Sequence, residues 1–431
     1  MMGSLAQKCK SLLGKKSARN SLWIISEQTF SIGATGVLMI IAARYLGAEQ
    51  YGVFSYGQTL VILFGAIAKV GIDSIIVNEL IRNKNEQGLI LGTSLALRLA
   101  SSLLSIILML ILLLLLNGNQ PLLIVVAMIQ SLFLLFQSGY VFDFWFQSKL
   151  ESRYASIAKT VATLFAASYG IFVLLNGLGV LWFAWMNVVM GGLTAILLLI
   201  LYKQRDGRPL AFSSQRAKSL LSDSYHFMIA GITAVIYVQV DKVMIGNIEN
   251  NTQLGYYAAA LTLCAAWSFL PNAITQSMRP VILEAKLASE ALYTLRLKQL
   301  FFIVFWLSAF VSALIAIAAP WIVSTLYGQS YAPSILIIQI AVWYMPLSML
   351  GTARGVWIVA EQKNKYVKYY LAVGLIINVV LNLYLIPRFG IIGAAVATII
   401  TELITGFFAP LCFSATRMYP KLALQALMYR V

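Results

Sequence analysis

Residues 88–116 read GLILGTSLALRLASSLLSIILMLILLLLL, and this run holds one charged side chain, that of Arg98. A helix of about 20 mostly apolar residues is long enough to cross a lipid bilayer. The rest of the chain has the same character, since 60% of its 431 residues are hydrophobic and only 11% are charged. Soluble domains carry roughly 25% charged residues. The sequence therefore predicts an all-α polytopic membrane protein.

Eleven further apolar runs divide the chain into membrane-spanning segments. The twelve predicted spans cover residues 21–43, 54–80, 88–116, 121–147, 155–176, 179–202, 221–244, 253–278, 299–323, 332–359, 366–387 and 390–413. A long polar stretch in the middle of the chain separates six spans from six. We therefore expect a six-helix bundle at 21–202, a cytoplasmic linker at 203–220, a second six-helix bundle at 221–413, and cytoplasmic tails at 1–20 and 414–431.

The basic residues are distributed unevenly over this predicted topology. Of the 31 Lys and Arg residues, 25 fall in the N-terminal tail and at every second loop after it. Cytoplasmic loops carry such an excess of cations, so both termini are predicted to be cytoplasmic. The net charge of +16 follows from this topology and from attraction to anionic lipid, and it does not require nucleic acid as a partner. Residues 4–20 could form an amphipathic helix on the membrane surface or a disordered basic tail.

A motif near residue 50 recurs in the second half of the chain. Residues 50–54 read QYGVF and residues 253–257 read QLGYY, at an offset of 203 residues that also relates the Thr-Leu pairs that follow. Both copies lie at the outer start of the second span of their half. Six spans per half give both halves the same orientation, so we expect two bundles related by a pseudo-twofold axis, with a substrate cavity between them. Gly52 and Gly255 are expected to serve tight turns or helix packing.

Several charged residues lie within or near the predicted spans, where each costs about 2.5–3.5 kcal/mol unless it pairs or meets water. Three cations are the candidates for an aqueous cavity that binds an anion, and a fourth lies at the inner end of the eighth span: Lys69, Arg98, Arg354 and Arg279. The alternatives are an i, i+4 pair between Lys69 and Asp73 and snorkelling of the two arginines to the interface. The candidates for coupling-ion binding or charge pairing are Glu27, Asp73, Asp143 and Asp241.

Two prolines, Pro271 and Pro346, lie within predicted spans and are expected to kink them. No phosphate-binding loop, nucleophile elbow or zinc-protease motif is found. The three cysteines are far apart and His226 is the only histidine, so no metal site is expected. The sequence thus predicts neither an enzyme nor a cofactor.

Three passages carry a resemblance to a known family: ARYLGAEQYGVF at 43–54, GIDSIIVNELIR at 71–82 and GIIGAAVAT at 390–398. Together with WFQ at 145–147 and DKVMIG at 241–246, they resemble the polysaccharide transporter family of the multidrug/oligosaccharidyl-lipid/polysaccharide (MOP) exporter superfamily. The likeness covers nearly the whole chain and is greatest to O-antigen flippases.

The resemblance implies a fold like that of the MATE transporters and a location in the bacterial inner membrane. It also implies a function, which is to move an undecaprenyl-diphosphate-linked oligosaccharide from the inner to the outer leaflet by alternating access. The resemblance further implies two protein partners, a polysaccharide polymerase and a chain-length regulator. Lysine and arginine side chains bind diphosphate directly, which fits the cationic candidates.

Three alternatives stay open. A cation-coupled multidrug exporter of the same superfamily would need a cavity of acids and aromatic residues, whereas the intramembrane charges here include a basic set. A peptidoglycan-precursor flippase usually has fourteen spans. A membrane-embedded glycosyltransferase or polymerase often has a large outer loop, and every predicted outer loop here is short.

Overall fold

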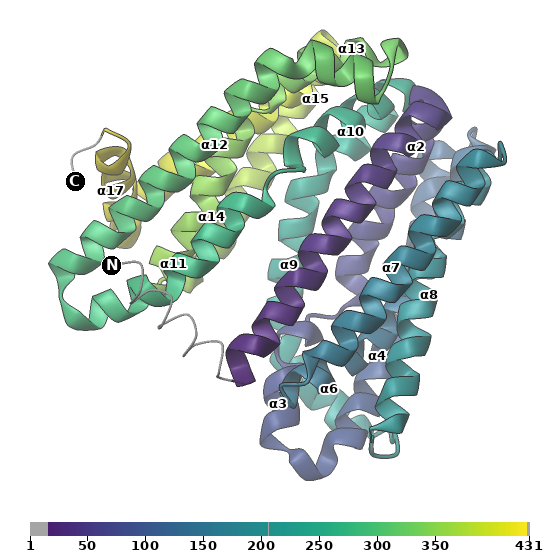
Figure 1. The fold of residues 1–431 in the computed structure, drawn as a ribbon, viewed down its shortest axis with the longest axis vertical. Coiled ribbons are helices and arrows are strands. Elements are labelled where there is room, and N and C mark those ends of the chain that lie inside the picture. The colour runs from purple at the N-terminus through teal and green to yellow at the C-terminus, as the bar shows by residue number, and fades with distance from the viewer. Residues whose placement is uncertain (1–15, 206, 429–431) are drawn as a thin grey trace. The chain divides into compact units, whose positions relative to one another are not determined.

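The computed structural model describes residues 16–205 and 207–428, and every regular element in these ranges is helical (Figure 1). The first half contains α2 (Lys16–Ala68), α3 (Ile76–Arg82), α4 (Gln87–Asn117), α5 (Pro121–Gln137), α6 (Val141–Ser148), α7 (Ser152–Leu175) and α8 (Val180–Gln204). The second half contains α9 (Ser214–Ile248), α10 (Asn251–Ala265), α11 (Phe269–Ala288), α12 (Glu290–Leu326), α13 (Pro333–Ala341), α14 (Tyr344–Ala360), α15 (Val367–Leu403), a π-helical turn (Ile404–Phe408), α16 (Ala409–Leu411) and α17 (Met418–Leu427). The all-α prediction is confirmed.

The helices are long and apolar enough for a multi-pass membrane protein. Within the described residues, nine helical segments could span a bilayer, or ten if the bent pair α10–α11 counts as one span. Two of them, Arg19–Ala68 with 50 residues and Asn364–Leu411 with 48, are each long enough to cross twice. When the bent pair counts as one span and each of these two segments counts as two, the total equals the predicted twelve.

Both double-length helices are interrupted at a glycine. Gly47 has φ 72° and ψ 168°, and Gly390 has φ 59° and ψ −143°. Glycine adopts positive φ without the steric cost of a Cβ. The first break therefore falls inside the predicted loop 44–53, and the second falls at the predicted start of the last span.

Two compact units make up the chain. The first contains residues 1–39 and 56–235, and the second contains residues 40–55 and 236–431. The middle of α2 thus belongs to the second unit, and the first two-thirds of α9 belong to the first. Of the predicted amphipathic tail at 1–20, residues 1–15 lie outside the described residues and the rest begin α2.

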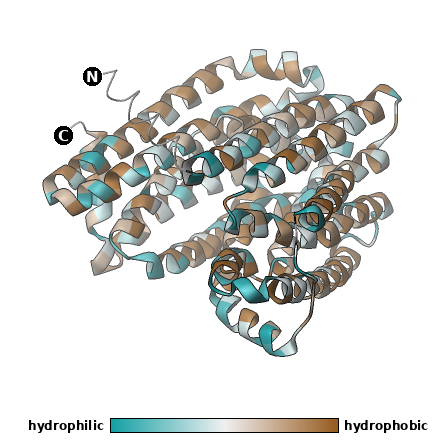
Figure 2. Ribbon diagram, turned by 60° about the horizontal axis from the view of Figure 1, so that its bottom comes forward, coloured by the Kyte–Doolittle hydropathy of each residue, from teal (hydrophilic) through white to brown (hydrophobic). Residues whose placement is uncertain are grey.

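Apolar side chains cover the outside of the helices, as expected of surfaces that face lipid. Leu115, Leu175 and Ile317 are 77%, 82% and 79% exposed. Figure 2 shows brown, hydrophobic residues along most of the helices, with teal, hydrophilic residues at many of their ends and turns. The inside holds small polar residues, including the fully buried Ser94 and Ser308.

The segment predicted as a cytoplasmic linker packs closely against the first unit. A Cβ on Gly88 would lie 2.2 Å from the carbonyl oxygen of Pro209, and one on Gly92 would lie 2.3 Å from that of Ala211. Arg216, at the start of α9, forms ion pairs with Glu79 at 3.6 Å and Glu86 at 2.6 Å. Two glycines at the start of α4 therefore let this segment dock on the helix.

The last predicted tail, 414–431, contains helix α17, which packs on α12 within the second unit. Its buried residues include Tyr419, Leu422 and Ala426. The Tyr419 ring meets the Phe301 ring edge to face, with centroids 5.6 Å apart. An aromatic residue at the start of the helix thus anchors it.

The structure extends the internal repeat beyond the motif seen in the sequence. The segments Pro121–Ser148 and Pro333–Ala360 are both 28 residues long and each starts with a proline, at an offset of 212 residues. The earlier motif has an offset of 203. The second half has therefore gained nine residues between these two landmarks.

The glycines of the first motif contact each other's helix reciprocally within the second unit. A Cβ on Gly52 would lie 1.7 Å from the carbonyl oxygen of Asn251, and one on Gly255 would lie 1.9 Å from that of Ala48. Residues 48 and 251 are themselves related by the same offset as the two glycines. This is the pattern that a local twofold relation between two copies of a motif produces.

Candidate functional site

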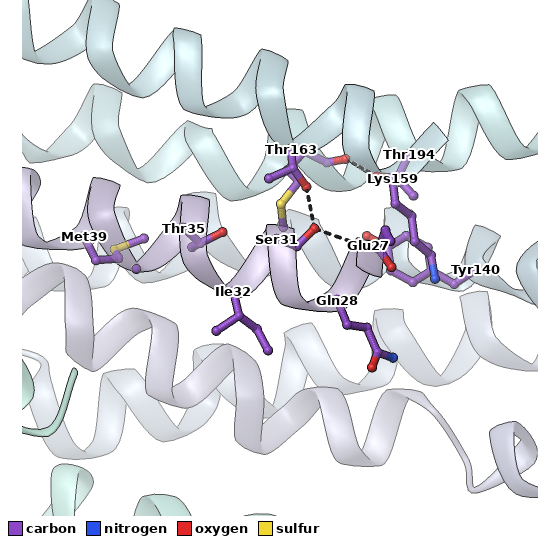
Figure 3. Close-up of a pocket in the computed structure, with 12 residues that line it drawn as sticks. Glu27, Gln28, Ser31, Ile32, Thr35, Met39, Tyr140, Lys159, Thr163 and Thr194 are labelled. Atoms are coloured by element: carbon purple, nitrogen blue, oxygen red, sulfur yellow. Dashed lines mark hydrogen bonds between the residues drawn. The ribbon is translucent and has the colours of Figure 1, made fainter. Parts of the chain in front are cut away.

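A cavity of about 520 Å³ lies among helices of the first unit, and we name it the Glu27 cavity (Figure 3). Helix α2 contributes one wall, and α7, α8 and the turn before α6 contribute the others. The lining residues are Glu27, Gln28, Ser31, Ile32, Thr35, Gly36, Met39, Tyr140, Lys159, Thr163, Met190 and Thr194. Five of them carry hydroxyl groups, which is unusual for the interior of an apolar bundle.

Helical spacing explains the hydrogen bonds in this cavity. Glu27 and Ser31 lie one turn apart on α2, and the Ser31 hydroxyl donates to Glu27 Oε1 at 2.8 Å. The Ser31 and Thr163 hydroxyls lie 3.2 Å apart and join α2 to α7. Figure 3 shows Glu27 and Lys159 at the same end of the cavity.

A buried ion pair supports the same wall. Lys159 on α7 forms a salt bridge with Asp143 on α6, and the Asp143 side chain is 9% exposed while that of Lys159 is 24% exposed. A charge pair inside a membrane bundle must be satisfied in this way, because an unpaired charge would be costly there. Of the sequence candidates, Glu27 thus lines this cavity and Asp143 supports it through Lys159.

A second cavity in the first unit, of about 310 Å³, contains Lys69 and Asp73, and we name it the Lys69 cavity. The Lys69 side chain is exposed. Among the described residues, no carboxylate lies within salt-bridge distance of its ammonium group. The cation is therefore free to meet an anion from outside the chain.

The alternative pairing of Lys69 with Asp73 does not form, because the helix between them ends. Helix α2 stops at Ala68, and the chain turns through Val70 and Gly71 with φ of 54° and 68°. A Cβ on Gly71 would lie 2.6 Å from the backbone of α9, so the turn is packed tightly there. The i, i+4 spacing holds only within a continuous helix.

Asp73 is paired with Arg98 instead, at a distance of 3.0 Å between Oδ1 and Nη1. Arg98 is 2% exposed, whereas Asp73 is 33% exposed and lines the Lys69 cavity. The predicted role of Arg98 as a cavity cation is therefore not what its geometry favours. The arginine is buried and its charge is met by a residue that faces the cavity.

Arg354 lies in the second unit among aromatic rings. Its guanidinium carbon is 4.9 Å from the centroid of Tyr370 and 5.6 Å from that of Tyr419, and Nη1 donates to the Thr405 carbonyl in the π-helical turn. Cation–π contacts of this kind hold a guanidinium in place. Arg354 thus ties α14 to α15 and α17, and its role at a substrate cavity stays a prediction.

The remaining candidates of the second unit are dispersed. Arg279 is exposed on α11, and no ion pair involving it is found in the part of the chain that the structure describes. Asp241 is buried and accepts hydrogen bonds from the Tyr257 hydroxyl at 2.6 Å and the Lys242 amide at 2.8 Å. Asp241 is therefore already satisfied within the chain.

Both predicted kink prolines follow breaks between helices. Pro271 lies in the first turn of α11, after a 41° bend from α10, and Pro346 lies in the first turn of α14, after the end of α13. A proline in the first turn removes no helical hydrogen bond. Within residues 16–205 and 207–428, no group of three or more His, Cys, Asp or Glu side chains is placed to hold a metal ion.

Sequence reasoning missed the polar wall of the Glu27 cavity, in particular Lys159, Thr163 and Thr194. Lys159 lies near the start of the predicted span 155–176. Its spacing of four residues from Thr163 was the available signal, since it places both side chains on one face of the span.

Comparisons with known proteins agree with this architecture. A model of the family described as "Polysaccharide biosynthesis protein" matches residues 17–286. The solved structure "Lipid II flippase MurJ, inward closed conformation" has a TM-score of 0.65 and 14% identity, covering 95% of this chain and 91% of that one. No curated protein sequence gives a match.

Two structures of a multidrug resistance MATE family transporter of the MOP superfamily are also similar. The inward-facing one has a TM-score of 0.70 and 15% identity, covering 93% of this chain and 95% of that one. The outward-facing one has a TM-score of 0.63 and 14% identity, covering 97% and 98%. The predicted MOP fold, like that of the MATE proteins, is confirmed.

Proposed function

This chain belongs to the polysaccharide biosynthesis protein family, and from that premise we propose that it is a flippase for a lipid-linked oligosaccharide. Its substrate is an undecaprenyl-diphosphate-linked repeat unit of a surface polysaccharide such as O-antigen. It moves this unit from the cytoplasmic to the outer leaflet of the bacterial inner membrane by alternating access. Both termini are cytoplasmic, as the distribution of basic residues favours.

The problem that such a protein solves is chemical. A diphosphate and a chain of sugar hydroxyls cannot enter hydrocarbon without partners for their charges and hydrogen bonds, whereas the polyprenyl tail can remain in the lipid. The protein therefore needs a cation for the diphosphate and hydrogen-bonding groups for the glycan, both inside an apolar shell.

The observation that carries the proposal is the ammonium of Lys69, which lies on the wall of a cavity in the first unit and forms no ion pair with any residue that the structure describes. Arg98 and Arg354 are engaged by Asp73 and by aromatic rings, so they have less to offer a phosphate. We assign the diphosphate to Lys69. The hydroxyl-rich Glu27 cavity suits the sugars, since side-chain hydroxyls both donate and accept hydrogen bonds.

The test is a translocation assay in proteoliposomes, with a fluorescent undecaprenyl-diphosphate glycan and an impermeant quencher. Loss of one charged hydrogen bond costs about 1.5–3 kcal/mol, or roughly 10- to 100-fold in rate. We expect Lys69→Ala to slow translocation by that factor and Lys69→Arg to retain most of it. Lys421→Ala, at an exposed position on α17, is the matched control.

The possible results test the flippase function and the role of Lys69 separately. If the wild-type protein leaves the labelled lipid in its original leaflet, the flippase proposal is wrong. If the wild type translocates it and Lys69→Ala does so equally fast, the assignment of the diphosphate to Lys69 is wrong while the function stands.

We assign the coupling to an ion gradient to Glu27, since a carboxylate facing a cavity can bind a proton or a cation. In the same vesicles, Glu27→Gln should abolish any stimulation by an imposed pH or sodium gradient and leave the gradient-free rate. If the gradient still stimulates translocation by the Glu27→Gln protein, Glu27 is not the coupling residue.

One observation favours a cation-coupled multidrug exporter as the second candidate. The Glu27 cavity combines a carboxylate with Met39, Met190 and Tyr140, which are side chains suited to a flat cationic drug. Lys159 in the same lining works against this reading, because it repels cations. Transport of ethidium by the wild-type vesicles, without movement of the glycan lipid, would favour the exporter.

A further inference from the structure

A third cavity lies at one end of the first unit, where the start of α2 meets the turn between α6 and α7. Its volume is about 330 Å³ and we name it the Arg19 cavity. It is lined by Lys16, Arg19, Asn20, Trp23, Leu150, Glu151, Arg153 and Tyr154. None of these residues lines the Glu27 or the Lys69 cavity, so this site is separate from the proposed transport path.

Specific contacts hold the two walls of this cavity together. The Asn20 Oδ1 atom accepts a hydrogen bond from the Ser152 amide at 2.7 Å and so caps the first turn of α7. The Arg153 guanidinium lies over the Trp23 ring, 5.6 Å from its centroid. Leu150, in the turn, takes the left-handed conformation with φ 57°. The cavity is thus built by the fold at both of its walls.

The cavity has an excess of positive charge that no ion pair within the described residues neutralises. Three cations, Lys16, Arg19 and Arg153, face a single carboxylate, that of Glu151. In the described ranges, none of these four side chains takes part in an ion pair. Like charges gathered around one hollow repel one another, so an anion from outside the chain would lower the energy of this arrangement.

The surroundings point to an anion that carries acyl chains. Two apolar side chains of the cavity lining are open to the outside, since Trp23 and Leu150 are 37% and 42% exposed. Tryptophan collects at the boundary between lipid and water. A headgroup phosphate in the cavity would therefore have hydrocarbon contacts for its chains beside it.

We propose that the Arg19 cavity binds the phosphate of an anionic phospholipid, such as phosphatidylglycerol, from the leaflet that surrounds the start of α2. Arg19 and Arg153 provide guanidinium groups that match the phosphate oxygens. Lys16 adds a third positive charge, and Trp23 packs beside the glycerol region. Anionic lipids of the cytoplasmic leaflet are attracted to clusters of this kind.

The test is native mass spectrometry of the full-length protein released from mixed micelles of phosphatidylglycerol and phosphatidylcholine. We expect the wild type to retain phosphatidylglycerol in preference to phosphatidylcholine, and the double variant Arg19→Gln/Arg153→Gln to lose about 10-fold of that preference. The double variant Lys203→Gln/Lys421→Gln removes two exposed cations elsewhere and should behave as the wild type.

Competition arms identify the source of the phosphate. Millimolar inorganic phosphate should displace little phosphatidylglycerol; equal potency would mean that a free anion suffices and would overturn the lipid assignment. Preferential retention of undecaprenyl diphosphate through Arg19 and Arg153 would overturn it as well, by assigning the cavity to the carrier lipid.

Two further results decide the proposal. Equal retention of the two phospholipids by the wild type, or an unchanged preference in the Arg19→Gln/Arg153→Gln protein, contradicts it. If that protein cannot be recovered in a monodisperse form, Lys16→Gln and a salt titration of the wild type replace it. The preference for phosphatidylglycerol should then fall with Lys16→Gln and with ionic strength, and a preference indifferent to both would contradict the proposal.

Discussion

Two turns related by the 212-residue offset have the same backbone conformation but differ in whether their charged side chains form ion pairs. Each follows a 28-residue segment whose last helix contains a buried tryptophan, Trp145 or Trp357. Five residues later comes a left-handed residue, Leu150 with φ 57° or Gln362 with φ 54°. A lysine ammonium lies over each indole, 3.8 Å from the centroid in the first turn and 4.8 Å in the second.

The carboxylates of the two turns differ. Glu361 in the second turn accepts hydrogen bonds from Lys286 and from the Tyr293 hydroxyl, and Lys363 lies 3.9 Å away. Glu151 in the first turn has no ion pair within the described residues and faces the Arg19 cavity. The carboxylate of the second turn is therefore paired with cations of the chain, whereas the cations beside the first turn remain available to a ligand.

The same contrast runs through the two units. The first unit presents Lys69, Glu27 and the Arg19 cluster to cavities, whereas the second covers Arg354 with tyrosine rings and satisfies Asp241 with Tyr257. A repeated scaffold can keep its backbone while its charges diverge. In the cavities described above, the charged side chains come from the first unit, whereas Arg354 and Asp241 of the second unit contact other residues of that unit.

The largest effect is expected where the two repeat copies are alike. Gly52→Ala would place a Cβ 1.7 Å from a backbone carbonyl oxygen, which cannot move as a side chain can. Overpacking of this kind costs about 1–3 kcal/mol or more, so we expect little folded protein by fluorescence-detected size-exclusion chromatography. Gly255→Ala, with a contact of 1.9 Å, should behave alike.

Gly351→Ala is the control for this pair, because nothing lies within 4 Å of a Cβ at that helical position. It should be recovered at the wild-type level. Normal recovery and melting of Gly52→Ala would mean that the reciprocal contact is not present in the folded protein.

A smaller effect should separate the roles of the two units. Arg354→Met keeps the length of the side chain but removes two cation–π contacts, each worth about 0.5–2 kcal/mol, and the hydrogen bond to Thr405. We expect a loss of roughly 1–3 kcal/mol in stability, measured as a lower melting temperature. The translocation rate per folded molecule should stay at the wild-type value, which is the reverse of the pattern expected for Lys69→Ala.

The opposite result would restore the cavity role that the sequence suggested for Arg354. A protein as stable as the wild type that no longer translocates the glycan lipid would show that the guanidinium contacts substrate.

Sequence reasoning reached the fold because span prediction depends on local apolar runs, which residues 88–116 display directly. It could not place the breaks, since Gly47 and Gly390 look like any other glycine until their backbone angles are known. The 212-residue repeat was also hidden. It rests on two prolines, two tryptophans and two left-handed residues with little other identity.

The candidate site was predicted less well, for a reason that Lys69 and Arg98 illustrate. Both were recognised as charges inside spans, but which of them is free depends on Asp73. Asp73 pairs with Arg98 because α2 ends at Ala68 and the chain makes a tight turn at Gly71. Arg354 presented the same difficulty, because one of the two rings that cover it belongs to α17, within a segment that composition alone described as a tail.

The smallest expected effect is on the pH dependence of stability, and it compares the carboxylates of the two turns. Burial acts to raise the pKa of Glu361, but the hydrogen bonds from Lys286 and Tyr293 and the charges of Lys286 and Lys363 outweigh it, so the pKa lies below its ordinary value of 4.5. A carboxylate with a lowered pKa in the folded state stabilises the protein above its unfolded-state pKa. That stability is lost as pH falls through the folded-state value.

Glu361→Gln should therefore melt lower than the wild type at pH 7, by the equivalent of about 1 kcal/mol, and the gap should close below about pH 4.5. Glu151→Gln is the matched control in the other turn, since its carboxylate makes no ion pair in the described residues and a smaller gap is expected. Melting curves between pH 7 and pH 4 measure both variants against the wild type. A gap for Glu151→Gln equal to that of Glu361→Gln would mean that the first turn closes its charges as the second does. That result would contradict the description of the Arg19 cavity as a site with unpaired cations.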